Sequence, residues 1–165
     1  MDREEQNPFL SEHYAEAMRY MDNATAFLEK AGKDGPLYTD KKYVQTACGT
    51  AYNGVLIALN AWFVLKEIPK LSKKQRKSID YYYERTAATD KKMLSFLRIA
   101  YSVLHLEGYY DGITSVKAIE AGFDAAYYII EKIKPEDFVP VKETRAQGMK
   151  RALNNLMISF AVMFR

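Results

Sequence analysis

The stretch SVKAIEAGFDAAYYIIEKI, residues 115–133, has the most regular hydrophobic repeat in the chain. Its apolar residues recur three or four positions apart, at Val116, Ile119, Phe123, Ala126, Ile130 and Ile133. This spacing places them on one face of an α-helix. We therefore expect a helix that begins at Thr114 or Ser115, packs against a core and ends before Pro135.

Helical spacing continues in both directions from this stretch, and no segment shows the sustained alternation of a strand. A first helix is expected over about 12–31, capped by Ser11 and stopped at Gly32. Its apolar face consists of Tyr14, Met18, Met21, Thr25 and Leu28. A second helix is expected to begin at Thr39 or Asp40 and to run to about Glu67, just before Pro69.

The middle of the chain predicts a long third helix with a bend. Ser72-Lys-Lys-Gln75 has the form of a capping box, which marks a helix start. The apolar register shifts near residue 89, where we expect a break, and Gly108 is expected to end the helix. The glycines of the stretch Gly108–Gly112 predict a turn.

Together these elements predict an all-α protein, an up-and-down bundle of five or six helices. The 165 residues are about the length of one domain, so a single domain over 1–165 is expected. Apolar residues make up 48 % and charged residues 27 %, which is ordinary globular usage and disfavours disorder.

The expected second helix passes a test for a membrane span, because Tyr43 to Leu65 contains no charged residue. Polar residues are nevertheless spread through it, at Gln45, Thr46, Thr50, Asn53 and Asn60. The other helices are amphipathic and need a core to face. A buried central helix with no membrane partner is therefore favoured.

Charge and cysteine usage narrow the function classes. Lys and Arg number 24 against 21 Asp and Glu, too small an excess to predict nucleic-acid binding from bulk charge. The lone Cys48 cannot form an intrachain disulfide, and the start MDREEQNPFL lacks the pattern of a signal peptide, so a cytoplasmic location is expected. Two His and one Cys are too few for a zinc site, and no cofactor is expected.

One pair of residues points to chemistry, Arg98 and His105, seven positions apart on the expected third helix. Seven steps of about 100° fall roughly 20° short of two turns, which places both side chains on one face about 10 Å apart. Tyr101 or Ser102 lies between them, and Tyr109 lies just beyond. A guanidinium and an imidazole offer a permanent positive charge and a proton donor or acceptor near neutral pH.

The segment Arg98-Ile-Ala-Tyr-Ser-Val-Leu-His105 resembles the Arg-x(4–6)-His motif of the HEPN superfamily (higher eukaryotes and prokaryotes nucleotide-binding). The following His105-Leu-Glu-Gly-Tyr-Tyr-Asp resembles the His-x-Tyr region of some members. The resemblance covers about residues 10–134 and implies a HEPN-like bundle. It leaves a connector at 135–145 and an additional C-terminal helix at 146–165.

The resemblance also implies a function, because many catalytic members form dimers whose paired motifs build a metal-independent RNase site. By this likeness Arg98 would bind the scissile phosphate, and His105 would assist proton transfer as the 2′-OH attacks. Ser102, Tyr101 and Tyr109 would contribute to binding RNA or a nucleotide. A homodimer joined near residues 94–110 is expected, with a nucleotidyltransferase as a candidate partner protein.

Two other functions stay open. Arg98 could form a surface ion pair while His105 caps its helix end, and the chain would then be a non-catalytic protein-protein interaction module, such as an antitoxin-like subunit. The third candidate is a small-molecule sensor with a pocket between the helices expected at 40–67 and 115–134.

Overall fold

The computed structural model describes residues 3–69, 71 and 76–138. Its elements are α1 (Arg3–Ala31), β1 (Lys33–Asp34), β2 (Leu37–Tyr38), α2 (Lys41–Leu65), α3 (Ile79–Thr89), α4 (Lys91–Ile99), the π-helix η1 (Ala100–Asp111) and α5 (Val116–Glu131). The prediction of a mostly helical protein is confirmed. The expected connector from residue 139 onward and the expected helix at 146–165 lie outside the described residues.

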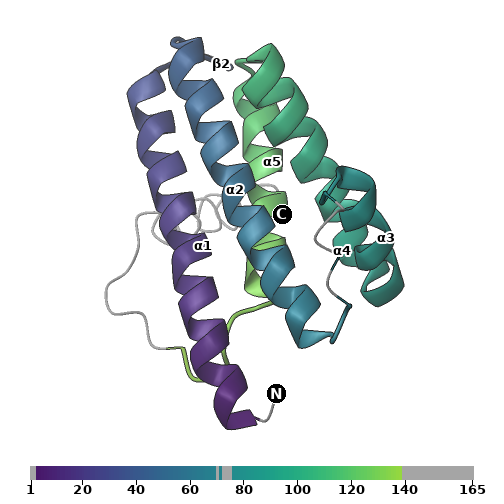
Figure 1. Cartoon of the computed structure of the whole chain (residues 1–165). Helices are drawn as coiled ribbons and strands as arrows, with labels where there is room; N and C mark the ends of the chain where they lie inside the picture. The colour runs from purple at the N-terminus through teal and green to yellow at the C-terminus, as the bar shows by residue number, and fades with distance from the viewer. Residues whose placement is uncertain (1–2, 70, 72–75, 139–165) are drawn as a thin grey trace, which may run out of the picture.

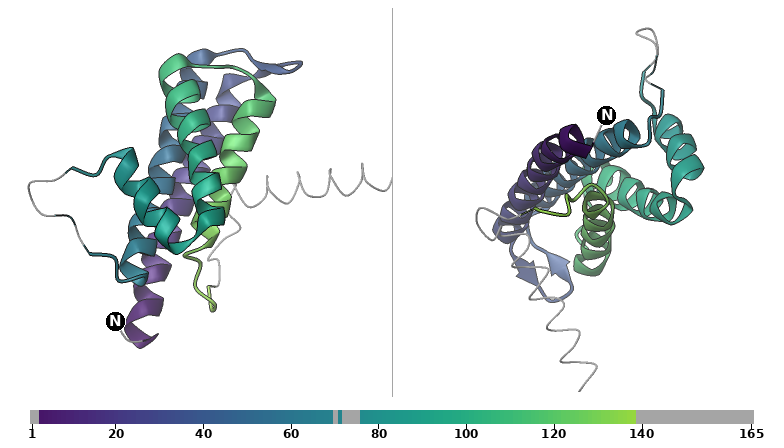
Figure 2. Two further views of the ribbon diagram at one scale, coloured as in Figure 1. Left: turned by 90° about the vertical axis from the view of Figure 1, so that its right-hand side faces the viewer. Right: turned by 90° about the horizontal axis from the view of Figure 1, so that it is seen from below.

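The long helical segments run up and down beside one another (Figure 1). They are α1, α2, the continuous rod of α4 and η1, and α5, and α3 packs beside α4 at one end (Figure 2). Helix α2 lies in the middle, where it contacts α1, η1 and α5. This position determines which of its residues can be reached from outside.

The predicted apolar faces of the first and last described helices form the core. Tyr14, Met18, Met21, Thr25 and Leu28 of α1 are all buried. On the predicted face of α5 and the turn after it, Val116 is half-buried, and the buried residues are Ile119, Phe123, Ala126, Ile130 and Ile133. Helix α2 is long and apolar enough to cross a membrane, but half of its most apolar window is buried inside the bundle. Such burial is typical of a core helix.

Several helix ends differ from the prediction. Helix α1 begins at Arg3, so Ser11 lies inside the helix and does not cap it, because the flanking Phe9 and Leu10 also pack against the core. Helix α3 begins at Ile79, capped by Ser78, and the residues just before it are not helical. The expected capping box at 72–75 lies outside the described residues.

A small hairpin was not predicted. Strands β1 and β2 pair in antiparallel fashion, Lys33 with Tyr38 and Asp34 with Leu37, across a turn at Gly35 and Pro36. Two-residue strands are too short to show alternation in a sequence. The pairing is supported from elsewhere, since the Tyr38 N–H donates to the carbonyl of Thr114 at 2.8 Å.

The expected break near residue 89 is present, and Asp90 forms it. Asp90 ends α3 and caps α4, and its carboxylate accepts from the Met93 N–H at 2.8 Å. The predicted helix end at Gly108 and turn at Gly108–Gly112 are wrong. The rod continues as the π-helix η1 to Asp111 and stops at Gly112, whose φ of +67° is left-handed and favours glycine.

Candidate functional site

His105 lies inside a stack of aromatic rings. Its imidazole lies 4.8 Å from the ring of Tyr52 on α2 and 5.2 Å from the ring of Tyr101 on η1, each tilted by 29°. Tyr109 and Tyr110 complete the group, with ring centroids 6.2 and 5.1 Å from the imidazole. We call these five residues the aromatic wall.

The π-helix explains why three of these rings line up. Its hydrogen bonds close five residues apart, so each residue turns by less than the 100° of an α-helix and residues four apart lie nearly one above the other. Tyr101, His105 and Tyr109 follow that spacing along η1. The neighbouring row of Ala100, Leu104 and Gly108 is buried against the core. Extended π-helices are uncommon, and short ones are frequent at functional sites.

Burial among these rings lowers the pKa of His105 below its ordinary value, because desolvation disfavours the charged imidazolium. The imidazole is therefore neutral at physiological pH and offers one donor and one acceptor nitrogen. Within the described part of the chain, no other side chain hydrogen-bonds it. Cys48 behaves differently, because burial raises its pKa to about 12 and keeps the thiol protonated and unreactive.

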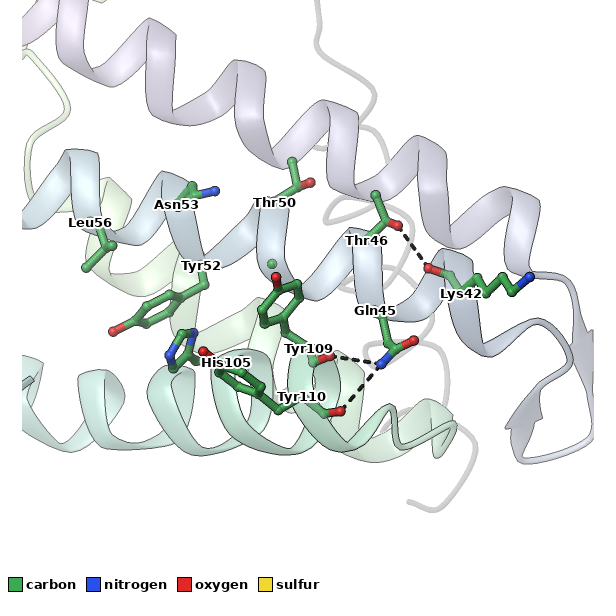
Figure 3. Close-up of a pocket in the computed structure, with 11 residues that line it drawn as sticks. Lys42, Gln45, Thr46, Thr50, Tyr52, Asn53, Leu56, His105, Tyr109 and Tyr110 are labelled. Carbon is green, nitrogen blue, oxygen red and sulfur yellow. Dashed lines mark hydrogen bonds between the residues drawn. The ribbon is translucent and has the colours of Figure 1, made fainter.

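A groove of about 770 Å³ opens between α2 and η1 in front of the aromatic wall (Figure 3). His105, Tyr109 and Tyr110 of the aromatic wall line the groove from η1. The remaining lining residues come from α2: Lys42, Gln45, Thr46, Gly49, Thr50, Tyr52, Asn53 and Leu56. The groove thus lies between α2 and η1, whereas the sensor pocket was expected between α2 and α5.

Four uncharged polar residues of α2 gather along this groove, whereas Asn60 lies outside its lining. Gln45, Thr46, Thr50 and Asn53 all line it, at the three- and four-residue spacing that keeps side chains on one helical face. Lys42 is the cation at one end of the row, and the lining includes no carboxylate. In the sequence these residues only interrupt an apolar helix, and nothing in it shows that the face they share lines a groove.

Gln45 holds the end of η1 in place. Its side-chain Nε2 donates to the backbone carbonyl of Tyr109 at 3.0 Å and to that of Tyr110 at 3.5 Å (Figure 3). Carbonyls in the last turn of a helix lack partners within that helix. Gln45 satisfies two of them from α2 and so positions both exposed rings of the wall.

Two glycines let η1 approach α2 closely. A Cβ atom on Gly49 would lie 2.9 Å from the Tyr109 ring, so the ring packs directly on the α2 backbone there. A Cβ atom on Gly108 would lie 2.5 Å from Cys48 Sγ. Neither position has room for a side chain. The two glycines therefore allow the Tyr109 ring to pack directly on the backbone of α2.

Arg98 does not line the groove together with His105. The Arg98 side chain is exposed and its guanidinium lies 5.0 Å over the ring of Tyr83 on α3. The smaller turn per residue in η1 moves His105 away from the face that an α-helix would share with Arg98. Ser102 also lies outside the lining, and its hydroxyl donates to Glu107 at 2.9 Å.

Comparison with known proteins gives a family without an assigned activity. The model of the family DUF5618, described as a domain of unknown function, matches residues 12–135. A solved structure of a protein of unknown function from Dyadobacter fermentans is similar, with 39 % identity and a TM-score of 0.67, covering 74 % of this chain and 94 % of that one. No curated protein matches the sequence.

Proposed function

We propose that this chain, which belongs to the DUF5618 family, binds a nucleotide or single-stranded RNA in the groove between α2 and η1. The observation that carries the proposal is the aromatic wall facing a row of uncharged polar groups. Tyr109 and Tyr110 expose 46 % and 63 % of their surface, so their rings are accessible for stacking. Stacking of one base on an aromatic ring contributes about 1–3 kcal/mol.

The charges of the groove favour this ligand over the other class that aromatic rings recognise. Aromatic cages also bind quaternary ammonium groups through cation–π attraction. Lys42 and the lack of a carboxylate in the lining oppose a cationic ligand. The same lysine attracts a phosphate, which leaves a ligand with planar rings and negative charge.

Binding is better supported than cleavage. The HEPN-like motif would need Arg98 and His105 at one phosphate, and only His105 lines the groove. The neutral imidazole remains available to hydrogen-bond a base or a ribose hydroxyl. The likeness of Arg98–His105 to the HEPN motif supports RNA as the polymer, although the Arg98 side chain lies on Tyr83 and does not line the groove.

The test is a titration of fluorescein-labelled single-stranded RNA of mixed sequence, followed by anisotropy and by gel analysis of the recovered strand. We expect saturable binding and an intact strand. The affinity should fall only weakly with salt, because one lysine lines the groove. The logarithm of the association constant should fall with the logarithm of the salt concentration with a slope near −0.7 for each phosphate neutralised. If the RNA is cleaved, and both His105→Ala and Arg98→Ala abolish the cleavage, the chain is a nuclease and the proposal of a pure binding function is wrong. If the chain binds neither RNA nor mononucleotides, the proposal is also wrong.

We also propose that the chain forms a homodimer through the exposed apolar residues of the α4–η1 rod. Ile99 and Leu106 are each 40 % exposed on this rod, although both are large aliphatic side chains. Exposed apolar residues grouped on one element are typical of interaction sites. A second copy also fits the expectation that the segment 94–110 joins two protomers.

Sedimentation velocity at micromolar concentration should therefore show a dimer. The double variant Ile99→Lys, Leu106→Lys should sediment as a monomer with an unchanged helical circular-dichroism spectrum, because charges at both positions cannot be buried unpaired. Lysines at the exposed Glu12 and Asn23 of α1 provide the matched control and should leave the dimer intact. A wild-type monomer under these conditions would contradict the proposed assembly.

A further inference from the structure

We infer that the groove binds a run of several nucleotides of one strand, with bases on the aromatic wall and a phosphate at Lys42, and not a single nucleotide. This inference rests on the proposed function and names the ligand class more closely. Three observations carry it: the length of the groove along α2, the distance of Lys42 from the rings, and the hydrogen-bonding groups that remain without partners.

The groove is longer than one nucleotide. Its lining on α2 extends from Lys42 to Leu56, which is about 21 Å at 1.5 Å per residue. Stacked nucleotides of one strand advance by about 3.4 Å each. By length alone, the lining of α2 could follow up to about six stacked nucleotides, and fewer when the strand is extended.

The phosphate site and the stacking sites are separated. Tyr109 packs on Gly49, seven residues along α2 from Lys42, which is about 10 Å at the rise of an α-helix. Tyr52 and the imidazole stacked on it lie one turn further along. This separation favours a strand that continues beyond the nucleotide whose base is stacked on Tyr109 or Tyr110.

The polar side of the groove supports contacts that do not depend on base identity. Gln45 already donates to two backbone carbonyls, and the Thr46 hydroxyl donates to the carbonyl of Lys42 at 2.9 Å. Within the described residues, Asn53 and Thr50 have no such partner. A carboxamide has a donor and an acceptor side by side, and a hydroxyl can act as either, so both can pair with the edge of any base.

The experiment compares unlabelled RNA strands of one, two, four, six and eight nucleotides as competitors for the labelled strand. We expect affinity to rise at least about tenfold from one to six nucleotides, as one further base is stacked, and then to level off. Homopolymers of equal length should differ less from one another than the hexamer differs from the mononucleotide.

The lysine is tested with a matched pair of variants. Lys42→Gln should weaken hexamer binding several-fold, and more than it weakens mononucleotide binding. Lys41→Gln makes the same change of charge on the adjacent lysine, which lies beside Gly112 and outside the groove lining, and should have little effect. If a mononucleotide binds as tightly as the hexamer, or if both lysine variants behave alike, the inference is wrong although the proposed function stands. If no strand of any length binds, the proposed function itself fails.

Discussion

The Tyr109→Ala variant is expected to bind single-stranded RNA about ten to a hundred times more weakly than the wild-type chain. The substitution removes the ring that lies on Gly49 and opens toward the groove, and one stacked base contributes about 1–3 kcal/mol. Tyr109→Phe should retain most of the affinity, because it keeps the ring. Anisotropy titration of the labelled strand measures all three proteins.

Two further variants make this result specific to the groove. Tyr43→Ala removes a tyrosine of similar exposure from α2 that does not line the groove, so its affinity should remain that of the wild type. Arg98→Ala should change the affinity by less than about threefold, since one solvent-exposed phosphate contact at most is lost. Equal losses in Tyr109→Ala and Tyr43→Ala would show that the aromatic wall has no special role.

The Gly108→Ala variant is expected to lose about 1–3 kcal/mol of unfolding free energy, measured by urea or thermal denaturation. Alanine is the better helix former by about 1 kcal/mol, so propensity alone predicts the opposite sign. The added methyl group would meet Cys48 Sγ at 2.5 Å and the carbonyl of Val103 at 2.8 Å. Helix η1 must then move away from α2, which also displaces the neighbouring Tyr109.

A double-mutant cycle identifies the contact responsible. Cys48→Ala removes the sulfur that the new methyl group would meet, so Gly108→Ala should cost less in the Cys48→Ala background than in the wild type. The single Cys48→Ala variant corrects for the loss of the buried thiol itself. Additive effects of the two substitutions would show that η1 and α2 do not meet closely at this point.

Much of the fold follows from local periodicity. The apolar positions of residues 115–133 and of the first helix predict their buried faces correctly, because a 3.6-residue repeat and the need to exclude water determine which side faces the core. The caps at Asp40 and Ser115 were also predictable, since a short polar side chain before an apolar repeat satisfies free N–H groups. The start of α1 was not, because packing of Phe9 and Leu10 against the core accompanies a longer helix.

For the site, the sequence by itself determined which residue types were available. His105, Tyr101 and Tyr109 were identified as candidates from their order on one helix, and all three belong to the aromatic wall. The same reasoning assumed 100° per residue and therefore paired His105 with Arg98. The structure places Arg98 on Tyr83 instead.

The position of Arg98 relative to the groove follows from long-range contacts and not from local sequence. Whether residues 100–111 form an α-helix or a π-helix depends on the contacts of η1 with its neighbours, at Gly108 against Cys48 and at Gln45 on the last carbonyls. Those contacts join residues about sixty positions apart, so no local pattern contains them. The polar row on α2 became a site in the same way, once η1 brought the aromatic wall to face it.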